Sequence, residues 1–186
     1  MKLSFLIKRT FDFILSLTAL LFFGWVIVIG FIVASIDVSS NGFFTQKRIG
    51  QYGVPFTIFK LKTIHPKTKK ISSLGKLLRK SKIDELPQLF NVLLGTMSFV
   101  GPRPDIPGYY DKVEGEFKKI LELKPGITCE ASIKYANEEM ILEKQENPLQ
   151  YNDEVIFPDK VKMNLEYYHK QSFWLDIKIL FRTIVR

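Results

Sequence analysis

An uncharged apolar run between Asp12 and Asp37 constrains the fold of this chain more than any other feature. As a straight helix, the segment from Phe13 to Ile36 would be about 36 Å long, which exceeds the ~30 Å hydrocarbon core of a bilayer. The run is too long for the apolar part of a cleavable signal peptide, and no small-residue cleavage motif follows it. The sequence therefore predicts a membrane-inserted helix within residues 1–40 and a second domain over residues 41–186.

The flanks of this run leave two topologies open. Lys8 and Arg9 precede it, and Lys47 and Arg48 follow it, so basic residues give no clear orientation. In one topology both ends stay on the cytoplasmic face, and the helix bends at Gly24, enters one leaflet and returns. In the other the helix is an ordinary tilted span.

Charge and cysteine content limit the classes of partner. The net charge of +8 over 186 residues predicts an anionic partner: nucleic acid, an anionic membrane surface or a phosphorylated substrate. No nucleic-acid recognition motif is present, and the apolar run argues against that class. The single Cys129 excludes an internal disulfide and fits a reducing compartment. His65 and His169 lack metal-ligand spacing.

Several cations surround the middle of the chain. Residues 56–63 have strand propensity, and alternation would place Lys60 and Lys62 on one face. The two lysines form either a phosphate clamp or a solvated strand edge. Arg79 belongs to a short helix that begins at Leu74, and it is suited to bidentate phosphate binding.

An amphipathic helix is predicted just after the acidic pair Asp84–Glu85. Pro87 fits its first turn, and Gly95 is a natural stop. The apolar residues at helical spacing are Leu86, Leu89, Phe90, Leu93 and Leu94. Asp84 would be the N-cap or a residue close to it, at the end of the helix where anions are stable, so it is either a plain cap or a catalytic carboxylate.

The C-terminal third is expected to be a polar loop over residues 143–158 followed by two helices. Residues 159–168 form the first helix. The second carries apolar residues at helical spacing, with Trp174, Lys178 and Arg182 nearby. This basic amphipathic pattern is typical of a membrane-interface helix, and a helix packed on the core is the alternative. The expected fold class is α/β, mainly helical with a small sheet, with interfacial amphipathic helices.

Several motifs of the chain come in the order of one known family. The segments are residues 43–50 (FFTQKRIG), 59–63 (FKLKT), 84–92 (DELPQLFNV), 97–104 (MSFVGPRP) and 124–128 (KPGIT), after the apolar run between Asp12 and Asp37. The sequence resembles the bacterial sugar transferases, specifically the small monotopic phosphoglycosyl transferases, over essentially its whole length.

That resemblance implies a reaction and its residues. Members transfer a sugar-1-phosphate from a UDP-sugar to undecaprenyl phosphate (a polyprenyl phosphate) through a covalent aspartyl intermediate, release UMP and use Mg²⁺. By similarity, Asp84 is the nucleophile and a magnesium ligand. Glu85 is its partner, which activates the lipid phosphate or positions the metal. Lys60, Arg79 and Arg103 match active-site positions.

The resemblance also implies a location. It places a re-entrant helix in the bacterial inner (cytoplasmic) membrane, with residues 41–186 as a catalytic domain on the cytoplasmic face. The reaction would be the first membrane step of O-antigen, capsule, exopolysaccharide or glycoprotein glycan synthesis. The partners would be the UDP-sugar, the polyprenyl phosphate and membrane lipid, with no nucleic acid. The alternative is a non-catalytic, membrane-anchored interaction protein of a glycan assembly system.

Two departures from the family pattern limit what the resemblance implies. The family usually has Ser-Pro in the middle of its membrane helix, where this chain has Gly24-Trp25. Many members also carry an arginine in the block after Thr128, which is missing here. Lys134 is the nearest cation that could replace that arginine. The sequence does not indicate the donor sugar.

Overall fold

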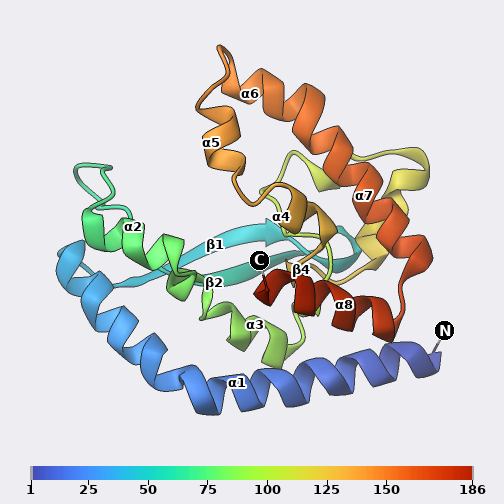
Figure 1. The fold of residues 1–186 in the computed structure, drawn as a ribbon, viewed down its shortest axis with the longest axis horizontal. Helices are drawn as coiled ribbons and strands as arrows, with labels where there is room; N and C mark the ends of the chain where they lie inside the picture. Colours follow the sequence, from blue (N-terminus) through green and yellow to red (C-terminus); the bar gives the residue numbers. More distant parts are fainter. Residues whose placement is uncertain (1, 186) are drawn as a thin grey trace. The chain divides into compact units, whose positions relative to one another are not determined.

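The structure is a computed structural model that describes residues 2–185, so that Met1 and Arg186 lie outside the described residues. The chain divides into two compact units. We call residues 8–48 and 55–97 the dyad unit, because they contain Asp84 and Glu85. The remaining described residues, 2–7, 49–54 and 98–185, form the C-terminal unit. Figure 1 shows the elements of both units in chain order.

The apolar run forms one continuous helix, α1 (Lys2–Asp37). Figure 1 shows that this helix changes direction in its middle part. Within the described residues, it is the one helix long and apolar enough to cross a membrane, judged by length and composition. Leu21, Phe22 and Trp25 are exposed, whereas Ala34 is buried against β2 and α2. Most of the apolar surface of α1 is therefore not used to pack the dyad unit.

The rest of the dyad unit is a small sheet with short helices. Its elements are β1 (Phe43–Ile49), β2 (Pro55–Leu61), α2 (Ser73–Lys80), a 3₁₀ turn (Ile83–Glu85) and α3 (Gln88–Leu94). Strands β1 and β2 pair with each other. Ser72 begins α2, because its Oγ accepts a hydrogen bond from the N–H of Gly75 at 2.9 Å. The same hydroxyl donates to Asp37 Oδ2 at 2.7 Å, which connects the end of α1 to the start of α2.

Strand β1 extends further than local residue preferences indicate. From the sequence alone, residues 47–50 are predicted to form a turn, and this is wrong, because the strand continues to Ile49. The reversal follows at residues 51–53, where Tyr52 has a φ of 58° and Gly53 one of 74°. Strand β1 pairs with β2, and local turn propensity does not end the strand before Ile49.

The C-terminal unit is mainly helical around a second two-stranded sheet. Its elements are β3 (Ser98–Val100), β4 (Gly126–Thr128), α4 (Glu130–Lys134), α5 (Glu138–Leu142), α6 (Pro148–Tyr151), α7 (Phe157–Lys170), α8 (Phe173–Ile184) and three 3₁₀ segments (Gln51–Gly53, Tyr110–Lys112, Gly115–Glu122). Strands β3 and β4 are parallel, with Ser98 opposite Gly126 and Val100 opposite Thr128. The loop expected over residues 143–158 is wrong for its second half, which forms α6 and a π-helical turn (Asn152–Ile156) leading into α7.

Two glycines allow the chain to approach itself closely beside this sheet. A side chain at Gly101 would collide with the backbone of Lys124, and one at Gly126 would collide with the backbone of Gly101. The core of the unit is completed by Tyr110, whose hydroxyl accepts from Asn164 Nδ2 at 2.7 Å, and by residues around Tyr167. The expected class, mainly helical with little sheet, is confirmed, although the strands form two small sheets.

Candidate active site

Asp84 lies on the 3₁₀ turn Ile83–Glu85, between α2 and α3. Pro87 has no N–H to donate to the carbonyl of Ile83, so that carbonyl accepts from the N–H of Leu86 at 3.2 Å instead. Asp84 lies close to the start of α3 but is not its N-cap: Pro87 holds that position, and no side-chain capping hydrogen bond is made there or at the start of the 3₁₀ turn. The Asp84 carboxyl is therefore not engaged as a cap.

Helix α3 turns polar side chains inward. Gln88 and Asn91 are both buried, whereas Phe90 and Leu94 of the apolar stripe are exposed. The helix ends at Gly95, as predicted, and this residue has a φ of 83°. The interior face of the helix that follows Asp84 therefore carries two polar side chains beside the apolar Leu89 and Val92.

Asn91 connects this helix to β2. Its Oδ1 accepts from the N–H of Phe59 at 3.0 Å, and its Nδ2 donates to the carbonyl of Thr57 at 2.7 Å. These bonds hold the segment of β2 that carries Lys60 against α3. Lys60 Nζ then donates to Glu85 Oε1 at 2.8 Å, in an ion pair with little solvent exposure.

The carboxyl of Asp84 is 7% exposed, and its Oδ1 has no hydrogen-bond partner among the described residues. Burial raises the pKa of this carboxyl, and the neighbouring Glu85 carboxylate raises that pKa further. The positive charges of Lys60, Lys82 and Arg79 act in the opposite direction and lower the pKa. The dyad is thus an acidic pair surrounded by cations, with one buried acceptor oxygen unpaired.

The cations around the dyad have distinct partners. Arg79, in the last turn of α2, donates from Nε to Thr63 Oγ1 at 3.2 Å. Lys62 Nζ donates to Ser40 Oγ at 3.5 Å. Lys60 contacts the dyad through Glu85, whereas Lys62 contacts the loop after α1 through Ser40.

Lys82 and Gln88 also belong to this site, and they were not predicted from the sequence. Lys82 has a left-handed backbone, with a φ of 59°, and its carbonyl accepts from the N–H of Glu85 at 3.1 Å. A strained non-glycine residue beside a reactive group is characteristic of functional sites. Gln88 is buried one helical turn after Asp84. Their spacing from Asp84, at i−2 and i+4, is the signal in the sequence that could have identified them.

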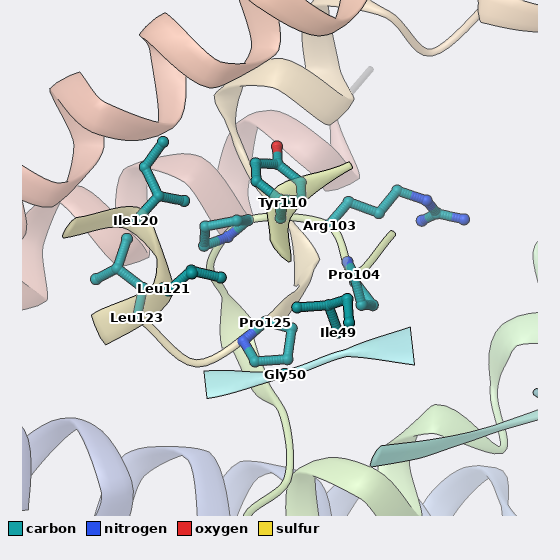
Figure 2. A pocket seen from close by; sticks show the side chains of 10 residues that line it. Ile49, Gly50, Arg103, Pro104, Tyr110, Ile120, Leu121, Leu123 and Pro125 are labelled. Atoms are coloured by element: carbon teal, nitrogen blue, oxygen red, sulfur yellow. The ribbon is translucent and has the colours of Figure 1, made fainter. Parts of the chain in front are cut away.

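Arg103 lies in the C-terminal unit, in the turn that follows β3. The N–H of Gly101 donates to the carbonyl of Thr128 at 3.0 Å, and the carbonyl of Pro102 accepts from the N–H of Gly126 at 2.8 Å. These two hydrogen bonds hold the turn against β4. Pro102 and Pro104 are buried, and Arg103 is exposed. The turn borders a shallow, mostly apolar pocket lined by Ile49, Gly50, Pro102, Arg103, Pro104, Tyr110, Ile120, Leu121, Leu123 and Pro125. Figure 2 shows the guanidinium of Arg103 directed away from these apolar side chains.

The structure therefore brings four of the five predicted site residues together in the dyad unit: Lys60, Arg79, Asp84 and Glu85. Arg103 is described with the C-terminal unit. In that unit Lys134 donates to Asp159 Oδ2 at 2.6 Å, and Tyr135 donates to the same oxygen at 2.7 Å. Lys134 is thus held in an ion pair on the surface of its own unit.

The acidic pair suits a magnesium ion that is held mainly by substrate. Among the described residues, no group of three or more His, Cys, Asp or Glu side chains could form a metal cage. Mg²⁺ does not need one, because it binds through one or two carboxylates, waters and substrate phosphates. The unpartnered Oδ1 of Asp84 is a suitable hard oxygen ligand of this kind. The residues present therefore fit a magnesium ion that arrives with a phosphorylated substrate.

Comparison with known proteins gives consistent matches along the chain. It is 32% identical to a protein of Bacillus subtilis called "Uncharacterized sugar transferase EpsL", over 96% of this chain and 86% of that protein. It is 35% identical to the "UDP-glucose:undecaprenyl-phosphate glucose-1-phosphate transferase" of Xanthomonas campestris, over 96% of this chain and 38% of that protein. The protein of the same name from Escherichia coli is 31% identical, over 97% of this chain and 40% of that protein.

The chain thus spans about two fifths of the length of these two transferases from Xanthomonas campestris and Escherichia coli. The family model described as "Bacterial sugar transferase" matches residues 3–186, which is nearly the whole sequence. This match includes the dyad unit and the turn that carries Arg103. On this evidence, the chain belongs to the bacterial sugar transferase family.

Proposed function

We propose that this protein is a phosphoglycosyl transferase that moves a sugar-1-phosphate from a UDP-sugar to undecaprenyl phosphate and releases UMP. The observation that carries the proposal is the buried Asp84 carboxyl, with one unpaired oxygen, among Lys60, Arg79 and Lys82. A carboxylate can act as a nucleophile towards phosphorus, and cations reduce its repulsion from a diphosphate. The names of the relatives from Xanthomonas and Escherichia coli support UDP-glucose as donor and undecaprenyl phosphate as acceptor.

The proposed reaction has two displacements at one phosphorus atom. In the first, an oxygen of Asp84 bonds to the β-phosphorus of the UDP-sugar, and the bond from that phosphorus to the bridging oxygen breaks. UMP leaves with the bridging oxygen, and the sugar phosphate stays on Asp84. In the second, an oxygen of the polyprenyl phosphate bonds to the same phosphorus, and the bond to Asp84 breaks. The products are the polyprenyl diphospho-sugar and a free Asp84 carboxylate.

The other predicted site residues have supporting roles in this proposal. The ion pair with Lys60 holds Glu85 in place, and the charges of Lys60 and Arg79 favour the ionised, nucleophilic form of Asp84. Arg103 is a phosphate-binding residue on a turn stiffened by prolines on both sides. Asp84 would hold a magnesium ion, which would neutralise charge on the phosphate oxygens when bound.

The contacts of α1 support insertion in the membrane from one face. Near the start of the helix, Arg9 donates to the carbonyls of Val92 and Leu93, both at 2.7 Å. At its end, Asp37 accepts from Ser72 at 2.7 Å. Both ends thus contact the dyad unit, and the exposed apolar side chains lie between them. A helix with its ends on opposite sides of a bilayer could not make both sets of contacts, which favours the re-entrant topology.

Helix α8 supports a membrane-interface location for the C-terminal unit. Asp176 and Ile179 are buried, whereas Trp174, Phe181 and Ile184 are exposed. This pattern leaves an apolar face and the exposed Lys178 available to lipid, whereas Arg182 forms an ion pair with Glu130. We propose that the protein lies on the cytoplasmic face of the bacterial inner membrane, where it would load the first phosphosugar of a cell-surface glycan.

A trapping experiment tests the proposed function. The purified protein would be incubated with Mg²⁺ and each of a panel of UDP-sugars labelled with ³²P at the β-phosphorus, without lipid. We expect one or more donors to label Asp84 and release UMP, and added undecaprenyl phosphate to remove the label. If no donor labels the wild-type protein or releases UMP with lipid present, the transferase proposal is wrong, and the alternative of a non-catalytic interaction protein is favoured.

A further inference from the structure

Gln88 carries a buried amide that the fold leaves unpaired. The residue is 1% exposed, and its Nε2 has no hydrogen-bond partner among the described residues. An unpaired buried donor costs free energy, and folded proteins contain few of them. A group of this kind therefore needs a physical explanation.

Asn91 shows that the explanation is not a general lack of partners on this face. It is equally buried and lies on the same helix, yet both atoms of its amide are bonded to β2, through Phe59 and Thr57. The difference between the two amides is position. Gln88 begins α3, shortly after the 3₁₀ turn Ile83–Glu85 that carries Asp84, whereas Asn91 lies one turn further along the helix.

Gln88 is the first residue of α3 and comes shortly after the 3₁₀ turn that carries Asp84. Long helical side chains lean towards the N-terminus of their helix, which for Gln88 is the side of Asp84. The unpaired donor of Gln88 and the unpaired acceptor oxygen of Asp84 are thus two buried groups four residues apart. The positive charges of Lys60, Arg79 and Lys82 all act on Asp84.

We propose that the Gln88 amide donates a hydrogen bond to a non-bridging oxygen of the phosphoryl group that reacts at Asp84. The inference rests on the proposed function and adds a substrate-contacting residue to it. Negative charge spreads over the three equatorial oxygens of the phosphoryl group in the transition state, so a fixed donor there binds the transition state more strongly than the ground state. A neutral amide does this without adding a positive charge beside the nucleophile.

The experiment compares two substitutions on α3. Gln88→Leu removes an unpaired donor while keeping a side chain of similar size, so we expect a melting temperature equal to or above that of the wild type. We also expect kcat and the rate of Asp84 labelling to fall by about 10²–10³-fold, with KM changed far less. Asn91→Leu, the matched control, removes satisfied hydrogen bonds and should lower the melting temperature.

Gln88→Glu is the second test variant, since it places a carboxylate acceptor where the donor was. We expect it to lose at least as much activity as Gln88→Leu. The inference is overturned if either folded variant labels Asp84 and turns over within about threefold of the wild type. Failure of the proposed function would look different, because the wild-type protein itself would then accept no donor, and both proposals would be rejected.

Discussion

At the scale of single residues, the free energy of the fold should depend on the charge of Asp84. Burial and Glu85 raise the pKa of this carboxyl in the folded protein, so the folded state holds its proton more tightly than the unfolded chain. The free energy of unfolding therefore decreases as the pH rises from the unfolded pKa, about 4, through the folded pKa. Asp84→Asn removes this penalty while keeping the shape of the side chain.

We expect Asp84→Asn to abolish turnover and to melt at a higher temperature than the wild type at pH 8. The gain in melting temperature should shrink as the pH is lowered through the folded pKa to about 4, and below that pH Asp84 of the wild type becomes protonated in both states. Thermal unfolding measured across this pH range checks the prediction. Glu146→Gln is a control, since Glu146 is exposed, and it should change neither quantity. If Asp84→Asn were less stable than the wild type at pH 8, the inference that the ionised, buried Asp84 destabilises the folded state would be contradicted.

The ion pair between Lys60 and Glu85 should contribute measurably to stability, because both side chains are mostly buried. In a double-mutant cycle of Lys60→Met and Glu85→Gln, we expect a coupling free energy of about 1–3 kcal/mol, measured by denaturant unfolding. The exposed pair Lys170–Glu166 is the comparison and should show no measurable coupling. Equal coupling in the two pairs would contradict the view that the first pair is a fixed part of the site.

The residues of the site differ in how far the sequence could predict them. Asp84, Glu85 and Lys60 stand out because acidic pairs and strand lysines have distinctive chemistry. Gln88 and Asn91 do not, because an apolar stripe normally marks the buried side of a helix. Here Phe90 and Leu94 are exposed, and burial of the opposite face depends on contacts with β2 that local periodicity does not contain.

At the scale of elements, the end of α3 needs a glycine for two reasons: a left-handed backbone and space for the side chain of Arg9. Gly95 has a left-handed backbone, and a Cβ there would lie 3.1 Å from Arg9 Nη2. Arg9 in turn satisfies the last carbonyls of the helix, those of Val92 and Leu93. The stop at Gly95 was predictable from its residue type, but its contact with a side chain of α1 was not, because that contact joins segments far apart in sequence.

Gly95→Ala should therefore lower the free energy of unfolding by more than the backbone strain alone would. Gly115 is the matched control, since it is also left-handed, with a φ of 59°, but nothing lies within 4 Å of an added Cβ. We expect Gly115→Ala to lower the free energy of unfolding, measured with denaturant, by about 1 kcal/mol. Gly95→Ala should lower it further, because the added Cβ also displaces Arg9. In an Arg9→Met background the two costs should converge. Equal costs in the wild-type background would show that Arg9 adjusts freely.

At the scale of the whole molecule, the topology of α1 decides where the dyad unit lies. The sequence left a single span and a re-entrant helix open, since both flanks are basic and Gly24-Trp25 replaces the family's Ser-Pro. The contacts of Arg9 and Asp37 with one unit favour re-entry. Such contacts are tertiary, so no hydropathy pattern could have predicted them.

Labelling of introduced cysteines distinguishes the two topologies. Thr10→Cys and Lys67→Cys place exposed thiols near the start of α1 and in the loop before α2, respectively. The native Cys129 is buried, so the wild-type protein should stay unlabelled by a membrane-impermeant maleimide. We expect both thiols to react in inside-out vesicles and neither to react in intact spheroplasts, because re-entry keeps both ends of the helix on the cytoplasmic side. A single span would expose the two thiols to opposite sides. Reaction of Thr10→Cys in spheroplasts would thus reject the re-entrant topology, and with it a dyad unit that holds both ends of α1 at one membrane face.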